Sequence, residues 1–257
     1  MPIPLSPQNP RVERIRELLT PRGRREQARY IIEGPTLIAE AQRSGLTLLE
    51  IIATDAALAD RPNLAALESA ELPLFVVPSR TFERISDLAT PSEMLAILAL
   101  TEGEPAAILA RRGPVLLLAG INDPGNAGTL LRSAEAFGAA GALFGRGGVD
   151  PYSPKVVRAA MGSSFRLPIA MVDADWLIEE ANRGGRPIVA ADMDGAEVGE
   201  LELPANAILA IGNERRGVRE WLPRFDLAVR IPQPGAAESL NAAVAGSILL
   251  YELARSR

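Results

Sequence analysis

Polar side chains that could do chemistry gather at three places where an apolar run gives way to a loop and then to a helix. Such junctions expose unpaired backbone N–H and C=O groups that can hold a polar ligand. The first spans residues 122–133, the second spans 212–217, and the third runs from Ile231 to the apolar helix after Asn241. The candidate side chains at these junctions are Asn126, Arg132, Glu214, Ser239 and Asn241.

Each junction also has an ordinary structural interpretation. Arg132 fits the solvent-facing surface of a helix, and Glu214 fits a carboxylate near the positive end of a helix dipole. Ser239 fits a helix cap. The junctions gain weight as a set, because similar arrangements recur three times in one part of the chain.

The chain contains no histidine and no cysteine. This composition excludes Ser-His-Asp triads, Cys-His pairs and disulfides, and it removes the usual zinc ligands, so we expect no metal. No G-x-G-x-x-G motif follows a predicted strand. The only lysine, Lys155, follows Pro154, so there is no phosphate-binding Walker loop. The usual NAD and ATP sites therefore lose their main support.

The elements that must position the three junctions alternate between strands and helices. Apolar runs predict strands over 115–120, 142–144, 169–172, 188–191, 207–211 and 227–231. Helical spacing predicts helices over 129–137, 155–161, 176–182 and after Asn241. This alternation predicts an α/β domain with a mostly parallel sheet.

The first hundred residues show a separate αβα pattern. A flexible lead-in is expected over 4–10 and a loop over 22–25. Helices are expected around Val12, Ile15 and Leu18 and over 36–43, 56–69 and 78–88, with strands over 49–53, 74–77 and 94–100. The polar, breaker-rich stretch 101–105 predicts a linker. We therefore divide the chain into domains 1–104 and 105–257.

The composition is that of a soluble globular protein, with 47% hydrophobic and 23% charged residues among 257. No apolar run is long enough to cross a membrane, and the N-terminus lacks the apolar core of a signal peptide. We therefore expect a cytoplasmic protein.

Charge is unevenly distributed along the chain. The net charge is −5, yet residues 1–29 hold seven arginines and three glutamates, about +4. A basic segment on an acidic body favours a local contact with a polyanion. An amphipathic helix with solvated charges explains the same pattern, and both interpretations stay open.

Together the junctions resemble the SpoU/TrmH RNA 2′-O-ribose methyltransferases of the SPOUT superfamily. The three family motifs match 126–134, 209–217 and 231–245, in order. The N-terminal part is similar to the family's RNA substrate-binding domain, itself like kink-turn-binding ribosomal proteins. Its marks are Asn9-Pro10, the Arg-rich loop expected over 22–25, Glu33-Gly34 and Thr90-Pro91, although the family usually has Gln-Gly where this chain has Ser92-Glu93.

The resemblance implies a parallel α/β catalytic domain tied in a trefoil knot, preceded by a small αβα substrate-binding domain. It implies S-adenosylmethionine as cofactor, and a homodimer with the site at the subunit interface. The cofactor-binding residues that it implies are Ile211, Gly212, Asn213, Ile231, Pro232 and Leu240. The catalytic residues are Asn126, Arg132, Glu214, Ser239 and Asn241.

The implied reaction is methylation of a ribose 2′-hydroxyl in a structured RNA. We expect Arg132 to stabilise the developing alkoxide, because its guanidinium stays protonated and cannot serve as the base. A substrate phosphate or water would take the proton. The extra N-terminal module favours ribosomal RNA. The alternatives are a tRNA 2′-O-methyltransferase, a non-catalytic RNA-binding assembly protein with the same fold, and an unrelated α/β enzyme that uses another nucleotide.

Overall fold

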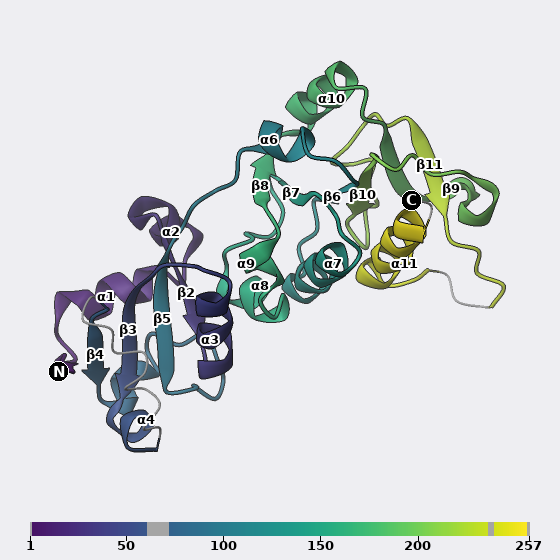
Figure 1. Cartoon of the computed structure of the whole chain (residues 1–257). Helices are drawn as coiled ribbons and strands as arrows, with labels where there is room; N and C mark the ends of the chain where they lie inside the picture. The colour runs from purple at the N-terminus through teal and green to yellow at the C-terminus, as the bar shows by residue number, and fades with distance from the viewer. Residues whose placement is uncertain (1, 61–71, 236–238, 256–257) are drawn as a thin grey trace. The chain divides into compact units, whose positions relative to one another are not determined.

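The computed structural model of the protein describes residues 2–60, 72–235 and 239–255 (Figure 1). The chain forms two units. The first contains Met1–Thr101 with Tyr152–Arg158, and the second contains Glu102–Pro151 with Ala159–Arg257. No motif in the sequence marks the return of 152–158 to the first unit, and the division into 1–104 and 105–257 stays a prediction.

The described part of the first unit contains a five-stranded mixed sheet in the order β1-β4-β3-β5-β2. Strand β4 is parallel to β1 and β3, whereas β5 is antiparallel to β3 and β2. The strands are β1 Ile3–Pro4, β2 Arg29–Glu33, β3 Leu48–Thr54, β4 Leu74–Val77 and β5 Met94–Ala99. The helices are α1 Pro10–Glu17, α2 Pro21–Gln27, α3 Pro35–Arg43, α4 Asp55–Asp60 and α5 Ser79–Phe82.

Helix α1 forms where the sequence predicts it. The Asn9 side chain accepts a hydrogen bond from the Arg11 amide at 2.9 Å, and Pro10 occupies the first helical turn, where its missing N–H costs nothing. Val12 and Ile15 are buried, and they belong to a core that includes apolar side chains of β2, β3, β4 and β5. The helix thus covers one face of the sheet.

Several expectations for the first unit are wrong. The loop expected over 22–25 is part of α2, because Thr20 caps a new helix at the Gly23 amide (3.0 Å) and Pro21 starts it. The lead-in over 4–10 begins inside an edge strand, whose Ile3 and Pro4 pair with β4. The helix expected over 78–88 ends at Phe82. Of the helix expected over 56–69, α4 covers the start, and 61–71 lie outside the described residues.

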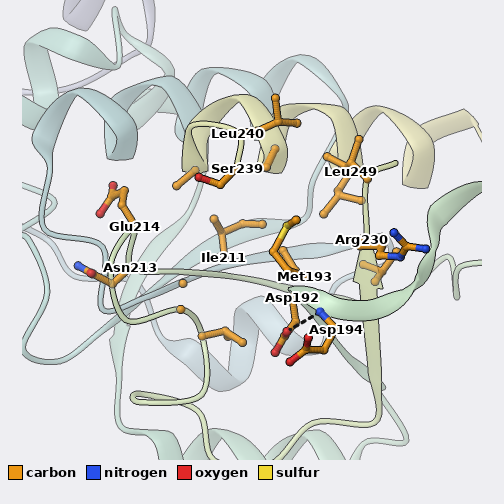
Figure 2. Close-up of a pocket in the computed structure, with 18 of the residues that line it drawn as sticks. Asp192, Met193, Asp194, Ile211, Asn213, Glu214, Arg230, Ser239, Leu240 and Leu249 are labelled. Carbon is orange, nitrogen blue, oxygen red and sulfur yellow. Dashed lines mark hydrogen bonds between the residues drawn. The ribbon is translucent and has the colours of Figure 1, made fainter. Parts of the chain in front are cut away.

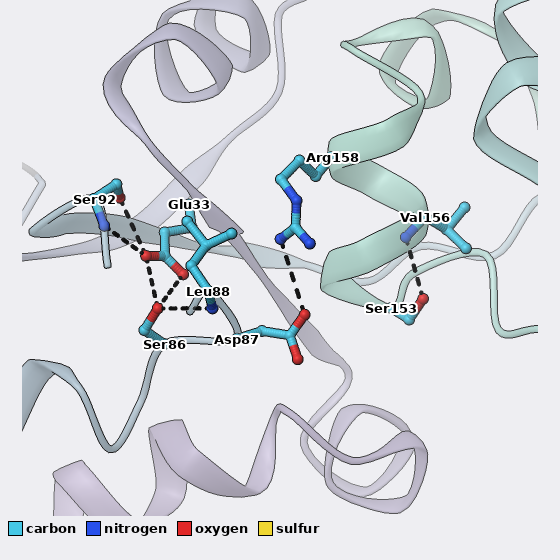
Figure 3. Close-up of polar contacts among 8 residues, drawn as sticks. All are labelled: Glu33, Ser86, Asp87, Leu88, Ser92, Ser153, Val156 and Arg158. Atoms are coloured by element: carbon cyan, nitrogen blue, oxygen red, sulfur yellow. Dashed lines mark hydrogen bonds and ion pairs between the residues drawn. The ribbon is translucent and has the colours of Figure 1, made fainter. Parts of the chain in front are cut away.

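One family mark of the first unit, Glu33, is a buried carboxylate that holds two neighbouring loop residues (Figure 3). It accepts hydrogen bonds from the Ser86 hydroxyl at 2.8 Å and from the Ser92 amide at 3.0 Å. Glu93 has a φ of 63°, in the region that favours glycine. The departure from Gln-Gly at 92–93 therefore leaves a non-glycine residue in a strained conformation, and it places a serine whose hydroxyl donates to Glu33 at 3.2 Å.

The second unit contains a six-stranded sheet in the order β11-β9-β10-β6-β7-β8, and every strand pair is parallel, as predicted. The strands are β6 Val115–Ala119, β7 Gly141–Gly145, β8 Ile169–Val172, β9 Ile188–Glu197, β10 Ile208–Gly212 and β11 Leu227–Arg230. The helices are α6 Pro105–Leu109, α7 Pro124–Ala136, α8 Pro154–Ala159 (which crosses between the units), α9 Ser163–Arg166, α10 Ala174–Arg183, the short 3₁₀ helix η2 Val198–Glu200, and α11 Ala242–Arg255.

Helices cover both faces of this sheet. Buried side chains of α6 and α10 share one core with residues of β6 and β10. Helices α7 and α11 lie side by side (Figure 1). They meet so closely that a Cβ at Gly246 would lie 2.4 Å from Leu130 and 3.1 Å from Ile211 of β10. The trefoil knot implied by the resemblance stays a prediction. Among the described residues, no helix combines the length and apolar character that a bilayer crossing requires.

Candidate active site

A cavity of about 340 Å³ opens in the second unit beside the middle of β9 and the carboxyl ends of β10 and β11 (Figure 2). The carboxyl ends of parallel strands are where open α/β sheets bind their ligands. Apolar side chains of Ile211, Leu240 and Leu249 line it, with polar groups along its rim. A mostly apolar cavity with a few fixed polar groups is typical of a small-molecule site.

A five-residue turn over 213–217 forms one wall of the cavity. The Gly217 amide donates to the Asn213 carbonyl at 2.9 Å, and the Asn213 amide donates back to Gly217 at 3.2 Å. Asn213 also anchors the turn to Gly120 through its side-chain amide at 3.3 Å. A Cβ at Gly212 would lie 2.2 Å from the Val218 nitrogen, so only glycine fits before this turn.

The side-chain amide of Asn126 joins all three junctions. Asn126 lies in the first turn of α7, donates through Nδ2 to Glu214 Oε1, and accepts from Asn241 Nδ2 at 2.9 Å. One residue from each family motif therefore takes part in a single hydrogen-bonded chain. Glu214 in turn lines the cavity, and it therefore connects the hydrogen-bonded chain of side chains to the cavity.

Helix caps hold two residues of this hydrogen-bonded chain, Asn126 and Asn241, in place. Asp123 accepts from the Asn126 amide at 2.7 Å and so caps α7. The Asn241 side-chain oxygen accepts from the Ala243 and Val244 amides at 2.9 and 3.2 Å. Asn241 thus caps α11, and the interpretation of Ser239 as the cap is wrong. Ser239 instead lines the cavity (Figure 2).

Seven of the predicted site residues line the cavity: Ile211, Gly212, Asn213, Glu214, Ile231, Ser239 and Leu240. Asn126 and Asn241 reach it through the Glu214 hydrogen bond. Pro232 is exposed and does not line it. Arg132 is exposed on α7, outside the cavity, and its side chain makes no hydrogen bond or ion pair with any described residue. The catalytic and cofactor-binding roles of all these residues stay predictions.

The sequence interpretation missed the wall formed by β9. Asp192, Met193 and Asp194 line the cavity (Figure 2), because β9 continues to Glu197 rather than ending at Ala191. Asp192 pairs with Arg219 at 2.8 Å. Polar residues directly after an apolar strand, at the ligand-binding edge of a parallel sheet, are the signal that could have found them.

Gln233 is a second lining residue that was missed. Its Nε2 donates to the Met193 sulfur at 3.6 Å, while its Oε1 is buried and has no hydrogen-bond partner in the described part of the chain. A buried acceptor without a partner costs free energy unless a ligand or water satisfies it. Within the described ranges, no group of three potential metal-binding side chains is present.

Comparisons with known proteins agree with this geometry. The family model described as "SpoU rRNA Methylase family" matches residues 113–251, and the "MRM3-like substrate binding domain" matches 9–96. The 23S rRNA (guanosine(2553)-2′-O)-methyltransferase RlmP of Bacillus subtilis is 30% identical, over 96% of this chain and 97% of that protein.

Solved structures give the same result. An S-adenosylmethionine-bound rRNA methyltransferase from Sinorhizobium meliloti superposes with a TM-score of 0.84, at 29% identity over 98% of this chain and 97% of the other. The SpoU methyltransferase AviRb of Streptomyces viridochromogenes, in complex with S-adenosylmethionine, gives 0.83 at 27% identity over 96% and 98%. The first family model spans more than half of the chain, and the chain therefore belongs to the SpoU rRNA methylase family.

Proposed function

We propose that this protein is an S-adenosylmethionine-dependent methyltransferase that modifies a ribose 2′-hydroxyl in ribosomal RNA. The observation that carries the proposal is the hydrogen-bonded chain of Glu214, Asn126 and Asn241, which brings all three motifs to one cavity. The names of the relatives in Bacillus subtilis and Sinorhizobium meliloti support the rRNA substrate. This substrate agrees with the predicted cytoplasmic location.

The cavity fits S-adenosylmethionine. Its apolar lining around Ile211 and Leu240 suits an adenine ring, and the free Oε1 of Gln233 can accept from a hydroxyl or amino group of the cofactor. Asp194 adds an exposed carboxylate on a wall that would face a cationic ligand. When bound, the cofactor supplies an electrophilic methyl group.

Catalysis by this chain rests on position and charge. No histidine or cysteine can accept the proton of the hydroxyl, and a guanidinium remains protonated. Arg132 therefore stabilises the developing alkoxide, while a substrate phosphate or water takes the proton. Asn126, Ser239 and Asn241 shape the edge where the ribose binds.

Arg132 reaches the site from a second copy of the chain. Its exposed position on α7 lies outside the cavity of its own chain, so we propose a homodimer in which it faces the partner's cavity. The exposed surface of α11 suits such an interface. Val244 and Tyr251, 47% and 50% exposed, are seven residues apart and so share one face of the helix.

The test is the Arg132→Ala variant. We expect methyl transfer to fall by about 100-fold or more, as for the loss of an oxyanion donor, because the alkoxide loses its positive partner. Binding of S-adenosylmethionine, measured by calorimetry, should stay within about twofold of wild type, since the proposed partner of Arg132 is the ribose oxygen and not the cofactor. Near-normal turnover would refute the role.

The substrate itself is tested in cells. Ribose methylation mapped across all RNA, with and without the gene, should show one lost position in ribosomal RNA. A lost position in tRNA would favour the tRNA alternative. No lost position, together with no cofactor binding, would favour the non-catalytic RNA-binding protein.

A further inference from the structure

A second cavity, of about 370 Å³, lies in the first unit beside α1. Three arginines line it, Arg11 and Arg14 from α1 and Arg29 from β2, together with Glu50 of β3. Neither motif residues nor the proposed cofactor site involve this cavity, which we name the arginine pocket.

Glu50 fixes two of the three guanidinium groups. It is 6% exposed, and it accepts from Arg11 Nη1 at 2.5 Å and from Arg29 Nη1 at 2.9 Å. A buried carboxylate needs such partners to offset its desolvation. Arg11 is held further by the Phe75 ring, 4.3 Å from its guanidinium carbon. The two arginines are therefore preorganised rather than free to rotate.

The pocket keeps positive charge after this pairing. Three guanidinium groups face one carboxylate, and Arg14 makes no side-chain hydrogen bond or ion pair with any described residue. Each guanidinium carries five N–H donors, so most of the donors on Arg11 and Arg29 also remain available. Fixed guanidinium groups with spare donors are the preferred partners of phosphate oxygens.

Three of the other arginines of the basic segment are already engaged, whereas Arg25 is exposed on α2, outside the arginine pocket. Arg16 pairs with Glu13 at 3.2 Å, and Arg22 pairs with Glu26 at 2.7 Å. Arg24 is 1% exposed and donates to the Leu18 carbonyl at 2.8 Å, so it serves the fold. The uncompensated charge of α1 and β2 is therefore concentrated at the arginine pocket.

We infer that the arginine pocket binds a backbone phosphate of the RNA substrate. This rests on the proposed function, because it needs an RNA to supply the phosphate. Arg14 provides the mobile contact, and Arg11 and Arg29 present a fixed surface on Glu50. The contact adds affinity without reading sequence, as backbone phosphate contacts do.

The test compares Arg14→Gln and the double variant Arg14→Gln/Arg29→Gln with the control Arg22→Gln, which removes an equally charged but glutamate-paired side chain. RNA binding is measured against salt concentration with a ribosomal RNA fragment. Arg14→Gln should lower the magnitude of the slope of log K against log salt by about 0.7 to 0.9 for one lost phosphate contact, whereas Arg22→Gln should leave it unchanged. In the methylation assay, KM for RNA should rise while kcat and cofactor affinity stay at wild-type values.

A variant of opposite sign separates binding from folding. Glu50→Gln removes the negative charge of the pocket lining but keeps a side-chain oxygen that can accept from Arg11 or Arg29, so we expect tighter RNA binding at low salt together with a lower melting temperature. A purely structural cluster would give weaker or unchanged binding in this variant. Equal slopes for Arg14→Gln and Arg22→Gln would overturn the phosphate site while leaving the proposed function intact. Failure of the wild-type protein to bind or methylate RNA would overturn both.

Discussion

The amide of Asn126 is the residue on which the geometry of the site depends most directly. It presents a donor to Glu214 and an acceptor to Asn241 at the same time, which an ionised carboxylate at this position could not do. The motif pattern predicted both asparagines and Glu214 as site residues. It did not reveal Asp192, because Asp192 lies outside the motifs and the strand before it was expected to end at Ala191. It did not single out Gln233 either, although this residue lies within the third motif, because the motif pattern does not show that its Oε1 is buried at the cavity.

Replacement of Asn126 by Asp tests this bridging role. The new carboxylate cannot donate to Glu214 and repels it, so the turn over 213–217 should shift and methyl transfer should fall by about 10-fold or more, in line with about 1.4 kcal/mol or more. Asn122→Asp changes the same chemistry at an exposed neighbouring position and serves as the control. Equal activity of the two variants would contradict the bridge.

The buried Oε1 of Gln233 at the cavity predicts that this side chain contributes to cofactor affinity. Gln233→Met keeps the length of the side chain but removes Oε1, and it should weaken S-adenosylmethionine binding by about 3- to 10-fold, the range of one neutral hydrogen bond. Gln233→Glu retains an acceptor and should bind more tightly than Gln233→Met. Calorimetry measures both, and identical affinities for all three proteins would exclude a contact with the cofactor.

At the level of elements, apolar periodicity predicted the strands β6, β7, β8 and β10 well, since they are buried, but it ended β9 too early because the second half of that strand is partly exposed. It predicted the helices of the first unit less well, because capping residues rather than apolar spacing set where those helices begin and end. Thr20-Pro21 begins α2 although 22–25 carries three arginines and a glycine, and Phe82 ends α5 early. The strand Arg29–Glu33 was missed because charged residues stand at both of its ends.

The contact between α7 and α9 predicts a pH dependence. Arg166 donates to Glu135 through Nε, and through Nη2 at 3.0 Å, and this hydrogen bonding lowers the pKa of Glu135 below its ordinary value of 4.5. A lowered pKa means that the carboxylate stabilises the fold above about pH 4.5 and that this contribution disappears as the pH falls through the lowered pKa. Glu135→Gln should therefore melt below wild type at pH 7.

The difference between the two melting curves should shrink as the pH falls below 4.5. It should correspond to less than about 1 kcal/mol, because Arg166 is 39% exposed and water screens the pair. A constant difference across the whole pH range would show that the Glu135→Gln substitution acts by packing rather than by loss of charge.

At the level of the whole molecule, the proposed dimer predicts that two defective chains can repair each other. Arg132→Ala has an intact cavity, and Leu240→Asp, with a charge in the cavity, keeps Arg132. The two variants are mixed in equal amounts and allowed to exchange subunits. If Arg132 acts on the partner's cavity, half of the dimers contain one chain of each variant, and each of these has one complete site of two. The mixture should therefore recover about a quarter of wild-type activity. Recovery of none, with mixed dimers verified by mass, would show that Arg132 serves its own chain.

The return of residues 152–158 to the first unit is the feature that the sequence analysis could least foresee, because the contacts that hold it there are long-range. The Tyr152 ring lies 5.4 Å from that of Tyr30, its hydroxyl donates to the Thr101 carbonyl at 3.0 Å, and Arg158 pairs with Asp87 at 3.9 Å (Figure 3). Burial raises the pKa of Tyr30.

Neither half of this protein can therefore be excised with a single cut. A fragment that stops at residue 101 lacks Tyr152 and Arg158, the partners of Tyr30 and Asp87. A fragment that starts at residue 102 contains 152–158 but lacks the residues of the first unit that this stretch packs against. When one half is truncated or exchanged with that of a relative, residues 152–158 must be kept together with the N-terminal residues.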